Sequence, residues 1–367
     1  MYREKISLLC YISLFSFATI SPMYQYGGFE TSAYSIKDKQ NKLTKEGLKE
    51  TLLQAIAEAD TGRISMLSHY ICEEMGWHQM LHAAFTQKYN RSPIEEASAR
   101  NLVVDCCLQM LDTDIDLCSY DPRRNRYVTD REKQKKFLNI PFDCEYYKAP
   151  ILHLAVSKGY NGIVDRLIRR GVDIFAMDTV GETAFHRLLK SKEIKRDMER
   201  RVIADHIIKY IYELCEALKR NSNLDELERK NLFLNAKTIY GEKGEKVTAL
   251  QLAIHLGQVF IAEELLYLGA DPFCKFEGKT ILLEALLTPN ITKDSVRKKL
   301  VEKVIMHIDN CESRAKKKEF YAATVKLTEY NNEAISALDL ACKKGYTDTF
   351  GAIALSIHNI QDNFYET

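Results

Sequence analysis

The chain has 367 residues, with 52 Lys and Arg against 51 Asp and Glu, and its formal net charge is +1. This balance gives no overall attraction to nucleic acid or to an anionic membrane, so neither is expected as the main partner. The length suits two domains or one extended repeat array. Long stretches rich in leucine, alanine, lysine and glutamate, with little strand-like alternation, predict an all-α fold.

The first 21 residues form a hydrophobic N-terminal segment. Arg3 and Lys5 precede an apolar run over 6–20, which has the length of a signal-peptide core and is short for a membrane span. The segment lacks an A-x-A cleavage site, and Pro22 follows directly. Two interpretations stay open: an export signal, which makes the chain a secreted protein, or a segment that packs on the rest of a cytoplasmic chain. The aperiodic stretch 22–43 is expected to be a linker.

The stretch 150–189 carries the clearest pattern in the chain. A short apolar helix begins at Leu152-His153, Gly159 ends it, and a second helix follows with apolar residues on one face. Gly171 ends that helix, and a turn leads to Phe185-His186, so the pattern returns after 33 residues, from 152 to 185. A helix pair followed by a turn at this spacing indicates a repeat.

The pattern recurs along most of the chain. Related starts stand at 80–84, 247–253, 280–285 and 336–341, with Gly-Ala-Asp at 269–271 between two of them. The first units, over 44–119, are degenerate, and a charged insertion follows at 120–148. The array proper is expected over 149–360, with an enlarged unit at about 190–245 and a polar tail at 361–367. A basic stretch, 314–318, is expected in a linker between two units.

These motifs resemble the ankyrin repeat, which has a period of about 33 residues and a T-P-L-H-x-A signature. The resemblance implies an ankyrin-repeat solenoid of stacked helix–turn–helix units, about seven in number, some enlarged. It further implies a non-enzymatic scaffold that binds a protein partner on its concave surface, with no cofactor, no metal, no stable membrane span and a monomeric state. With its export-like start, degenerate units and insertions, the chain resembles the ankyrin proteins that intracellular bacteria deliver into host cells.

Ankyrin arrays bind through their turn tips and the exposed face of their inner helices, so the resemblance also implies candidate partner-binding residues. Phe276 is the most informative of them, because an exposed aromatic side chain at a turn tip suits an anchor. The full set is Ser157, Lys158, Thr179, Val180, Glu182, His255, Phe276, Glu277, Lys279, Lys343 and Lys344.

Catalytic chemistry finds little support in the motifs. His82, His153 and His186 each follow the first signature position, and this recurrence favours a structural role, in which the family's histidine hydrogen-bonds the turn of a neighbouring unit. The ten cysteines form no C-x-x-C pair and are expected to be free thiols. A Cys–His enzyme in the N-terminal region, with the array as a targeting arm, stays open as the alternative. A nucleic-acid or lipid-head-group binder that uses the basic loops is a more distant third.

Overall fold

The computed structural model describes residues 45–71, 76–86, 89, 93–113, 118–121, 126–129, 131–143, 148–221, 224–241, 244–310 and 313–362. The hydrophobic segment and the linker expected within 1–43 lie outside the described residues. The chain divides into two compact units, Met1–Phe137 and Leu138–Thr367. No helix among the described residues is long and apolar enough to cross a membrane.

The described residues of the first unit form two helix pairs, a hairpin and a further helix. Their bounds are α3 Lys45–Glu58, α4 Thr61–Ile71, α5 Gly76–Thr86, α6 Pro93–Thr113, β1 Cys118–Asp121, β2 Arg126–Thr129 and α7 Arg131–Leu138. The core of this unit is apolar, with Leu52, Ile56, Leu81 and Val103 fully buried. Here α3 packs on α4, and α5 packs on α6.

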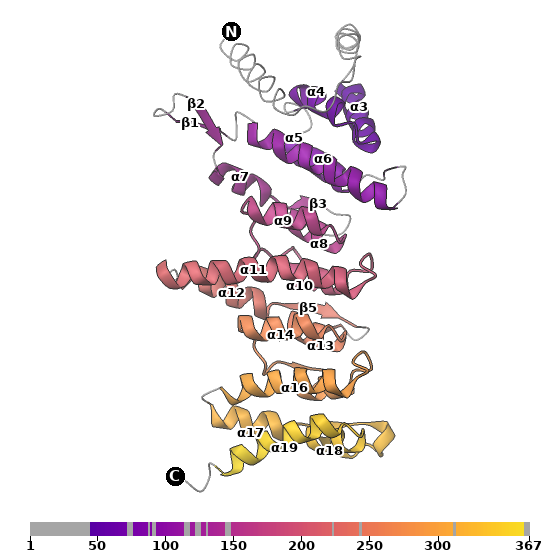
Figure 1. Cartoon of the computed structure of the whole chain (residues 1–367), viewed down its shortest axis with the longest axis vertical. Helices are drawn as coiled ribbons and strands as arrows, with labels where there is room; N and C mark the ends of the chain where they lie inside the picture. Colours follow the sequence, from indigo (N-terminus) through magenta and orange to yellow (C-terminus); the bar gives the residue numbers. More distant parts are fainter. Residues whose placement is uncertain are drawn as a thin grey trace. The chain divides into compact units, whose positions relative to one another are not determined.

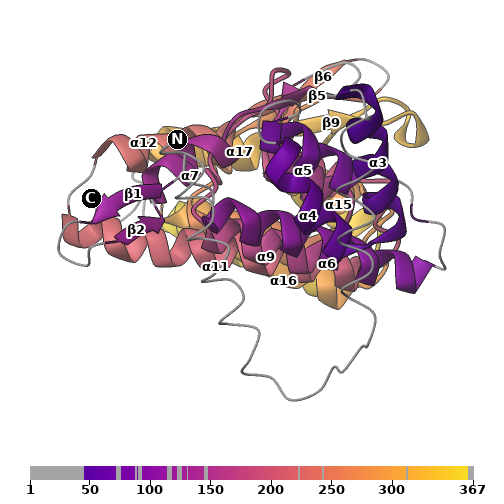
Figure 2. The ribbon, with the colours of Figure 1, turned by 90° about the horizontal axis from the view of Figure 1, so that it is seen from above.

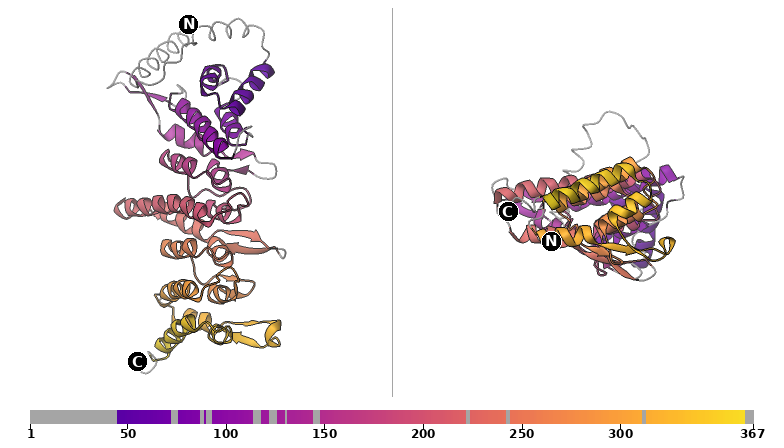
Figure 3. Two further views of the ribbon diagram at one scale, coloured as in Figure 1. Left: turned by 45° about the vertical axis from the view of Figure 1, so that its right-hand side comes forward. Right: turned by 90° about the horizontal axis from the view of Figure 1, so that it is seen from below.

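The second unit repeats one arrangement five times: a helix pair, then a return to the next pair through a turn or a hairpin (Figures 1 and 3). Its inner helices are α8 Ile151–Ser157, α10 Ala184–Lys190, α13 Ala249–His255, α15 Ile281–Leu287 and α18 Ala337–Lys343. Its outer helices are α9 Asn161–Arg169, α11 Asp197–Asn221, α14 Val259–Leu268, α16 Asp294–Asp309 and α19 Thr347–Asp362. Inner helices contact inner helices and outer helices contact outer helices along the stack, so the second unit is a two-layered solenoid.

Among the described residues of this unit, three antiparallel two-stranded hairpins connect successive pairs, and a fourth precedes the first pair. They are β3 Phe142–Asp143 with β4 Lys148–Ala149, β5 Lys237–Tyr240 with β6 Glu245–Thr248, β7 Lys275–Phe276 with β8 Lys279–Thr280, and β9 Thr324–Lys326 with β10 Ala334–Ser336. Before α10 the connection is a turn at 178–181 instead, whose Thr179 N–H donates to the carbonyl of Lys148 at 3.1 Å. The hairpins project from one side of the stack (Figure 3).

The inner helices begin where the sequence places a capping residue. Thr248, Thr280 and Ser336 each accept, on the side-chain oxygen, a backbone N–H from three residues further on. This satisfies one of the donors that every helix start leaves open. The helices are only seven residues long and would not be stable alone. Burial against their neighbours stabilises them, as the fully buried Leu152 and Leu250 show.

Alternate units carry a third helix, which the ankyrin pattern does not contain. Helix α7 follows α6, α12 Leu224–Asn235 follows α11, and α17 Arg314–Ala322 follows α16. The pairs α8–α9 and α13–α14 lack one. Within the second unit, α12 and α17 lie on the same side of the stack (Figures 1 and 2).

Each third helix in the second unit packs on the loop of the preceding helix pair by the same contacts. Phe233 of α12 meets Phe175 edge-on, with ring centroids 5.4 Å apart, and Phe320 of α17 meets Phe273 edge-on at 5.8 Å. The same loops are also hydrogen-bonded by an asparagine that precedes them in the chain, at or just after the end of a third helix. The side chain of Asn139, just after α7, accepts from the Asp173 N–H at 2.7 Å, and that of Asn235, at the end of α12, accepts from the Asp271 N–H at 2.8 Å.

The structure corrects one expectation and leaves the domain bounds as a prediction. The basic stretch 314–318, expected to be a linker, is the first half of α17. It is helical because Ser313 caps it and because Phe320 and Tyr321 are buried on one face. The enlarged unit predicted at about 190–245 contains α11 and α12, and the predicted insertion at 120–148 contains α7.

Candidate functional site

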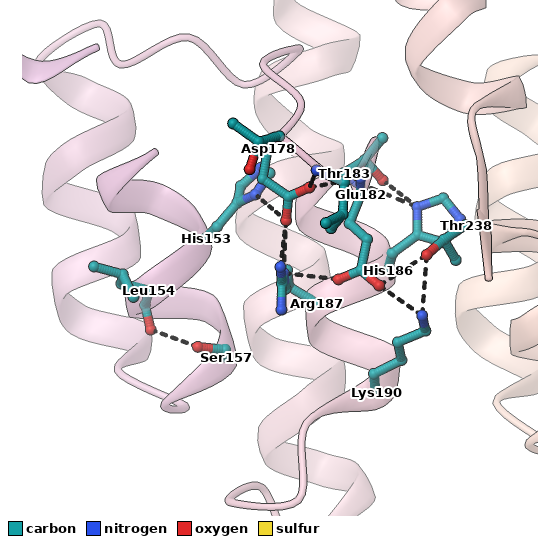
Figure 4. Close-up of polar contacts among 12 residues, drawn as sticks. His153, Leu154, Ser157, Asp178, Glu182, Thr183, His186, Arg187, Lys190 and Thr238 are labelled. Atoms are coloured by element: carbon teal, nitrogen blue, oxygen red, sulfur yellow. Dashed lines mark hydrogen bonds and ion pairs between the residues drawn. The ribbon is translucent and has the colours of Figure 1, made fainter. Parts of the chain in front are cut away.

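The hairpin side of α10 carries a buried network of charged side chains (Figure 4). Arg187 Nε lies 2.9 Å from Asp178 Oδ2 and 2.8 Å from Glu182 Oε2. Lys190 Nζ lies 2.6 Å from Glu182 Oε1 and donates to Thr238 Oγ1 at 3.0 Å. It also donates to the Ile239 carbonyl at 2.7 Å. The network therefore ties the turn at 178–181, helix α10 and strand β5 together.

The network keeps its carboxylates ionised. Burial raises the pKa of Asp178, but hydrogen bonds from His153 and Arg187 outweigh it and bring the pKa down to about 2. Burial acts the same way on Glu182, and Lys190 and Thr238 lower the pKa of that carboxyl below its usual range. Paired charges of this kind fix geometry more than they raise stability, since desolvation offsets most of their attraction. The network therefore acts as a clamp: it holds the turn at 178–181 and strand β5 in place against helix α10.

A ladder of aromatic and charged side chains continues from the network along the stack. His255 meets Tyr240 edge-on at 5.7 Å and Phe276 edge-on at 5.6 Å between ring centroids. The cation of Lys190 lies 5.9 Å from the Tyr240 ring, and that of Lys279 lies 5.6 Å from the Phe276 ring. The ladder thus spans two hairpins and two inner helices.

The buried carboxylate of Glu284 fixes the imidazole in the middle of this ladder. His255 Nδ1 lies 2.7 Å from Glu284 Oε1, and Lys279 Nζ lies 3.4 Å from Glu284 Oε2. The His255 side chain is 36% exposed, whereas that of Glu284 is 5% exposed. The buried carboxylate of Glu284 therefore fixes the orientation of the His255 ring, which remains partly exposed to solvent.

The structure places most of the sequence-predicted partner-binding residues on the hairpin side or at the ends of the inner helices. Lys158, Thr179, Val180, Glu277 and Lys343 are exposed. The half-buried residues of the set are Ser157, His255, Lys279 and Lys344.

Two of the predicted residues are buried, so the expectation that they are exposed is wrong. Phe276 is only 6% exposed, because its ring packs against His255 and lies under Lys279. Glu182 is also 6% exposed, because it neutralises Arg187 and Lys190 in the network. Neither side chain offers a free surface, so Phe276 supports its neighbours and is not an accessible anchor.

Sequence reasoning missed Arg187, Lys190, Ile239 and Tyr240. Lys190 could have been found, because it ends its inner helix at the position that Ser157, His255 and Lys343 occupy in theirs. Ile239 had no such signal: its 64% exposure follows from the pairing of β5 with β6, which places it opposite Lys246 on the outer face of the hairpin.

His153 bonds the turn of a neighbouring unit, as expected, whereas His186 caps its own helix; the role of His82 stays a prediction. His153 Nε2 lies 3.2 Å from the carbonyl of Ala176, in the turn that leads to the next unit. His186 completes a capping box with Thr183, whose hydroxyl lies 2.9 Å from His186 Nδ1. Burial lowers the pKa of His186 to about 4, so the ring is neutral at physiological pH.

The cysteines whose side chains the structure describes are free thiols: Cys106, Cys107, Cys215, Cys274 and Cys342. Burial raises the pKa of the Cys106 and Cys107 thiols, which is opposite to the shift that a thiolate nucleophile requires. Among the described residues, no cluster of His, Cys, Asp and Glu has the arrangement of a metal site.

Short helix pairs that are stable only against their neighbours, joined by hairpins on one side, define a helical repeat protein. The family model for the ankyrin repeat matches residues 150–179 and 245–275, which cover α8–α9 and α13–α14. The chain therefore contains ankyrin repeats over these residues. Ankyrin repeats are in general protein-interaction modules and typically have no enzymatic activity, so their presence supports a scaffold role in general.

Two solved structures illustrate the likeness. The crystal structure of EF0377, an ankyrin repeat protein, is 18% identical, with a TM-score of 0.33 over 61% of this chain and 92% of its own. An ankyrin repeat domain from Acinetobacter baumannii AYE is 17% identical, with a TM-score of 0.27 over 56% of this chain and 96% of its own. A comparison with curated proteins finds no match.

Proposed function

We propose that the chain is a scaffold that binds a protein partner on the hairpin side of its second unit, over the turn at 178–181 and the hairpin β5–β6. The observation that carries the proposal is that exposed apolar side chains stand directly beside the buried polar network that holds their backbone in place. Thr238, next to Ile239 in β5, donates to Glu182 at 2.8 Å, while the side chains of Val180 and Ile239 are 55% and 64% exposed. Exposed β-branched side chains on a rigid support lose little conformational freedom on binding.

Other predicted residues lie in this surface or further along the same unit. Thr179 and Val180 lie in the turn itself, and the His255 edge lies next to Tyr240 of the same hairpin. Lys343 and Lys344 lie at the end of α18, near Tyr330. Because Glu182 and Glu284 already neutralise the cations of the ladder, we infer that contact area and hydrogen bonds, more than net charge, select the partner.

Affinity capture from a cell extract with paired variants tests the surface. Val180→Glu with Ile239→Glu places charge on two exposed side chains of the hairpin side and should abolish recovery of the partner. Tyr267→Glu with Leu355→Glu is the matched control, since these side chains are 47% and 63% exposed on outer helices. Equal recovery with both variants would show that the partner binds elsewhere.

We further propose delivery into a host cell as the setting of this scaffold. The apolar run over 6–20 behind Arg3 and Lys5 is the feature that supports export. Mass determination of the N-terminus of the secreted or cell-retained chain decides between removal of this segment and its retention.

A further inference from the structure

The last helix pair that the structure describes, α18–α19, is in register with α8–α9 and α13–α14. The residues that precede their inner helices are Pro150, Thr248 and Ser336. Nine residues after each of them stands a glycine with positive φ: Gly159 at 78°, Gly257 at 70° and Gly345 at 72°. The three pairs can therefore be compared position by position.

The comparison identifies a face of α18–α19 that is buried in the other two pairs. On the inner helix, Val156 and Ile254 are fully buried, and their counterpart Cys342 is exposed. On the outer helix, Val164 and Ala262 are fully buried, and their counterpart Phe350 is 36% exposed.

Further positions agree with this difference. Leu152 and Leu250 are fully buried, whereas their counterpart Leu338 is only half-buried. The opposite face of α19 behaves like the rest of the stack: Ile353 is fully buried, and α19 packs closely on α16. In the first two pairs the buried face lies against the next helix pair, α10–α11 or α15–α16. Among the described residues, nothing covers that face of α18–α19.

We propose that this face joins two copies of the chain, with α18–α19 of one copy stacked on α18–α19 of the other about a two-fold axis. The preceding interfaces show that a face of this kind accepts a helix pair, and α18–α19 is itself such a pair with an apolar face to bury.

The charges on α18 favour a second copy over an unrelated helix pair. Asp339 is exposed where His153 and Gln251 are buried, and Lys343 follows one helical turn later with the opposite charge. A two-fold axis across the face brings Asp339 of each copy towards Lys343 of the other, so the face is complementary to itself. Asp339 keeps this capacity, because the Ser336 hydroxyl occupies only its Oδ2, at 2.7 Å.

One helix pair stacked on another is a small interface, so we expect a dissociation constant in the micromolar range. Sedimentation velocity of the full chain over a concentration series tests the proposal. The wild type should shift from monomer to dimer as concentration rises, and Phe350→Glu should stay monomeric throughout. Leu355→Glu is the control on the same helix: Leu355 is 63% exposed, and its counterparts Tyr267 and Arg169 stay exposed although their units are stacked.

A charge exchange tests the two-fold arrangement itself. Asp339→Lys alone should weaken the dimer at least tenfold, and Asp339→Lys with Lys343→Asp should restore it, with circular dichroism showing that each variant is folded. A wild type that stays monomeric at every concentration, the state expected from the sequence, overturns the proposal. So does a dimer that survives Phe350→Glu, or an exchanged variant no stronger than the single one.

Discussion

His186 and Gln251 stand at the same position of two inner helices and perform the same task with different chemistry. His186 Nδ1 accepts the N–H of Thr183 at 3.3 Å, and Gln251 Oε1 accepts the N–H of Thr248 at 2.9 Å. Both close a capping box, which satisfies two backbone donors at a helix start. The difference is that only the histidine titrates, so it makes the stability of its unit depend on pH.

We expect His186→Gln to remove part of this pH dependence. Because the pKa is about 4 in the folded chain against 6.5 for an ordinary histidine, the unfolded chain binds a proton between these values that the folded chain does not. The contribution of the neutral His186 to the free energy of unfolding is thus fully present above pH 6.5 and is lost as the pH falls towards 4. From pH 7.5 to pH 5 the wild type should lose about 2 kcal/mol through this residue.

Urea unfolding of both proteins at pH 7.5 and pH 5 measures the difference. Asp178 does not interfere, since its pKa of about 2 places its titration at lower pH. Parallel losses in the wild type and the glutamine variant would show that His186 is not the titrating group.

At the scale of elements, the third helices are the main departure from an ordinary ankyrin array. Helix α12 bridges two helix pairs through loops that carry an aspartate and a phenylalanine, because Asn235 bonds the loop at 271 and Phe233 packs on the loop at 175. Ankyrin units contact only their nearest neighbours. A helix that contacts the loop of the preceding pair and the loop of the following pair therefore adds cooperativity between successive units.

Phe233→Ala should therefore be costly. The ring is 1% exposed and lies against Phe175 and Phe185, with centroids 5.4 Å and 5.7 Å away. Its loss should lower the free energy of unfolding by about 3–5 kcal/mol, as for other buried phenylalanines. The adjacent Leu232→Ala is the control, because that side chain is 57% exposed and should cost under about 0.5 kcal/mol. Chemical denaturation followed by circular dichroism compares them; similar losses would contradict the bridging role.

The elements that local rules govern could be predicted from the sequence. Thr248, Thr280 and Ser336 cap helices because of their own chemistry, and Gly257 ends one because its φ is 70° and a side chain there would meet Asn290. What depends on distant residues could not. Besides Arg187 and Lys190, the buried Glu182 has a partner in Thr238, which lies 56 residues further on in the chain. The basic stretch 314–318 likewise did not predict helix α17, because that helix is stabilised by the packing of Phe320 on the distant Phe273.

At the scale of the whole molecule, the second unit presents two kinds of surface. Its hairpin side combines a buried clamp with exposed apolar side chains, and its outer helices carry scattered exposed residues such as Tyr267 and Leu355. The central claim is that a protein partner is bound on the hairpin side. From the sequence, this claim rests on family resemblance alone. The structure also changes the residues that support it, because Phe276 is buried and Ile239, which was not predicted, is exposed.

Site-specific photo-crosslinking tests this claim most directly. Benzoylphenylalanine is placed singly at Val180, Ile239, Tyr267 or Leu355 of the full chain. These side chains are 47–64% exposed, so a larger side chain there should leave the core packing intact. Irradiation in a cell extract should yield covalent partner adducts from positions 180 and 239 and none from 267 and 355. Adducts from the outer-helix positions, with none from the hairpin side, would contradict the account.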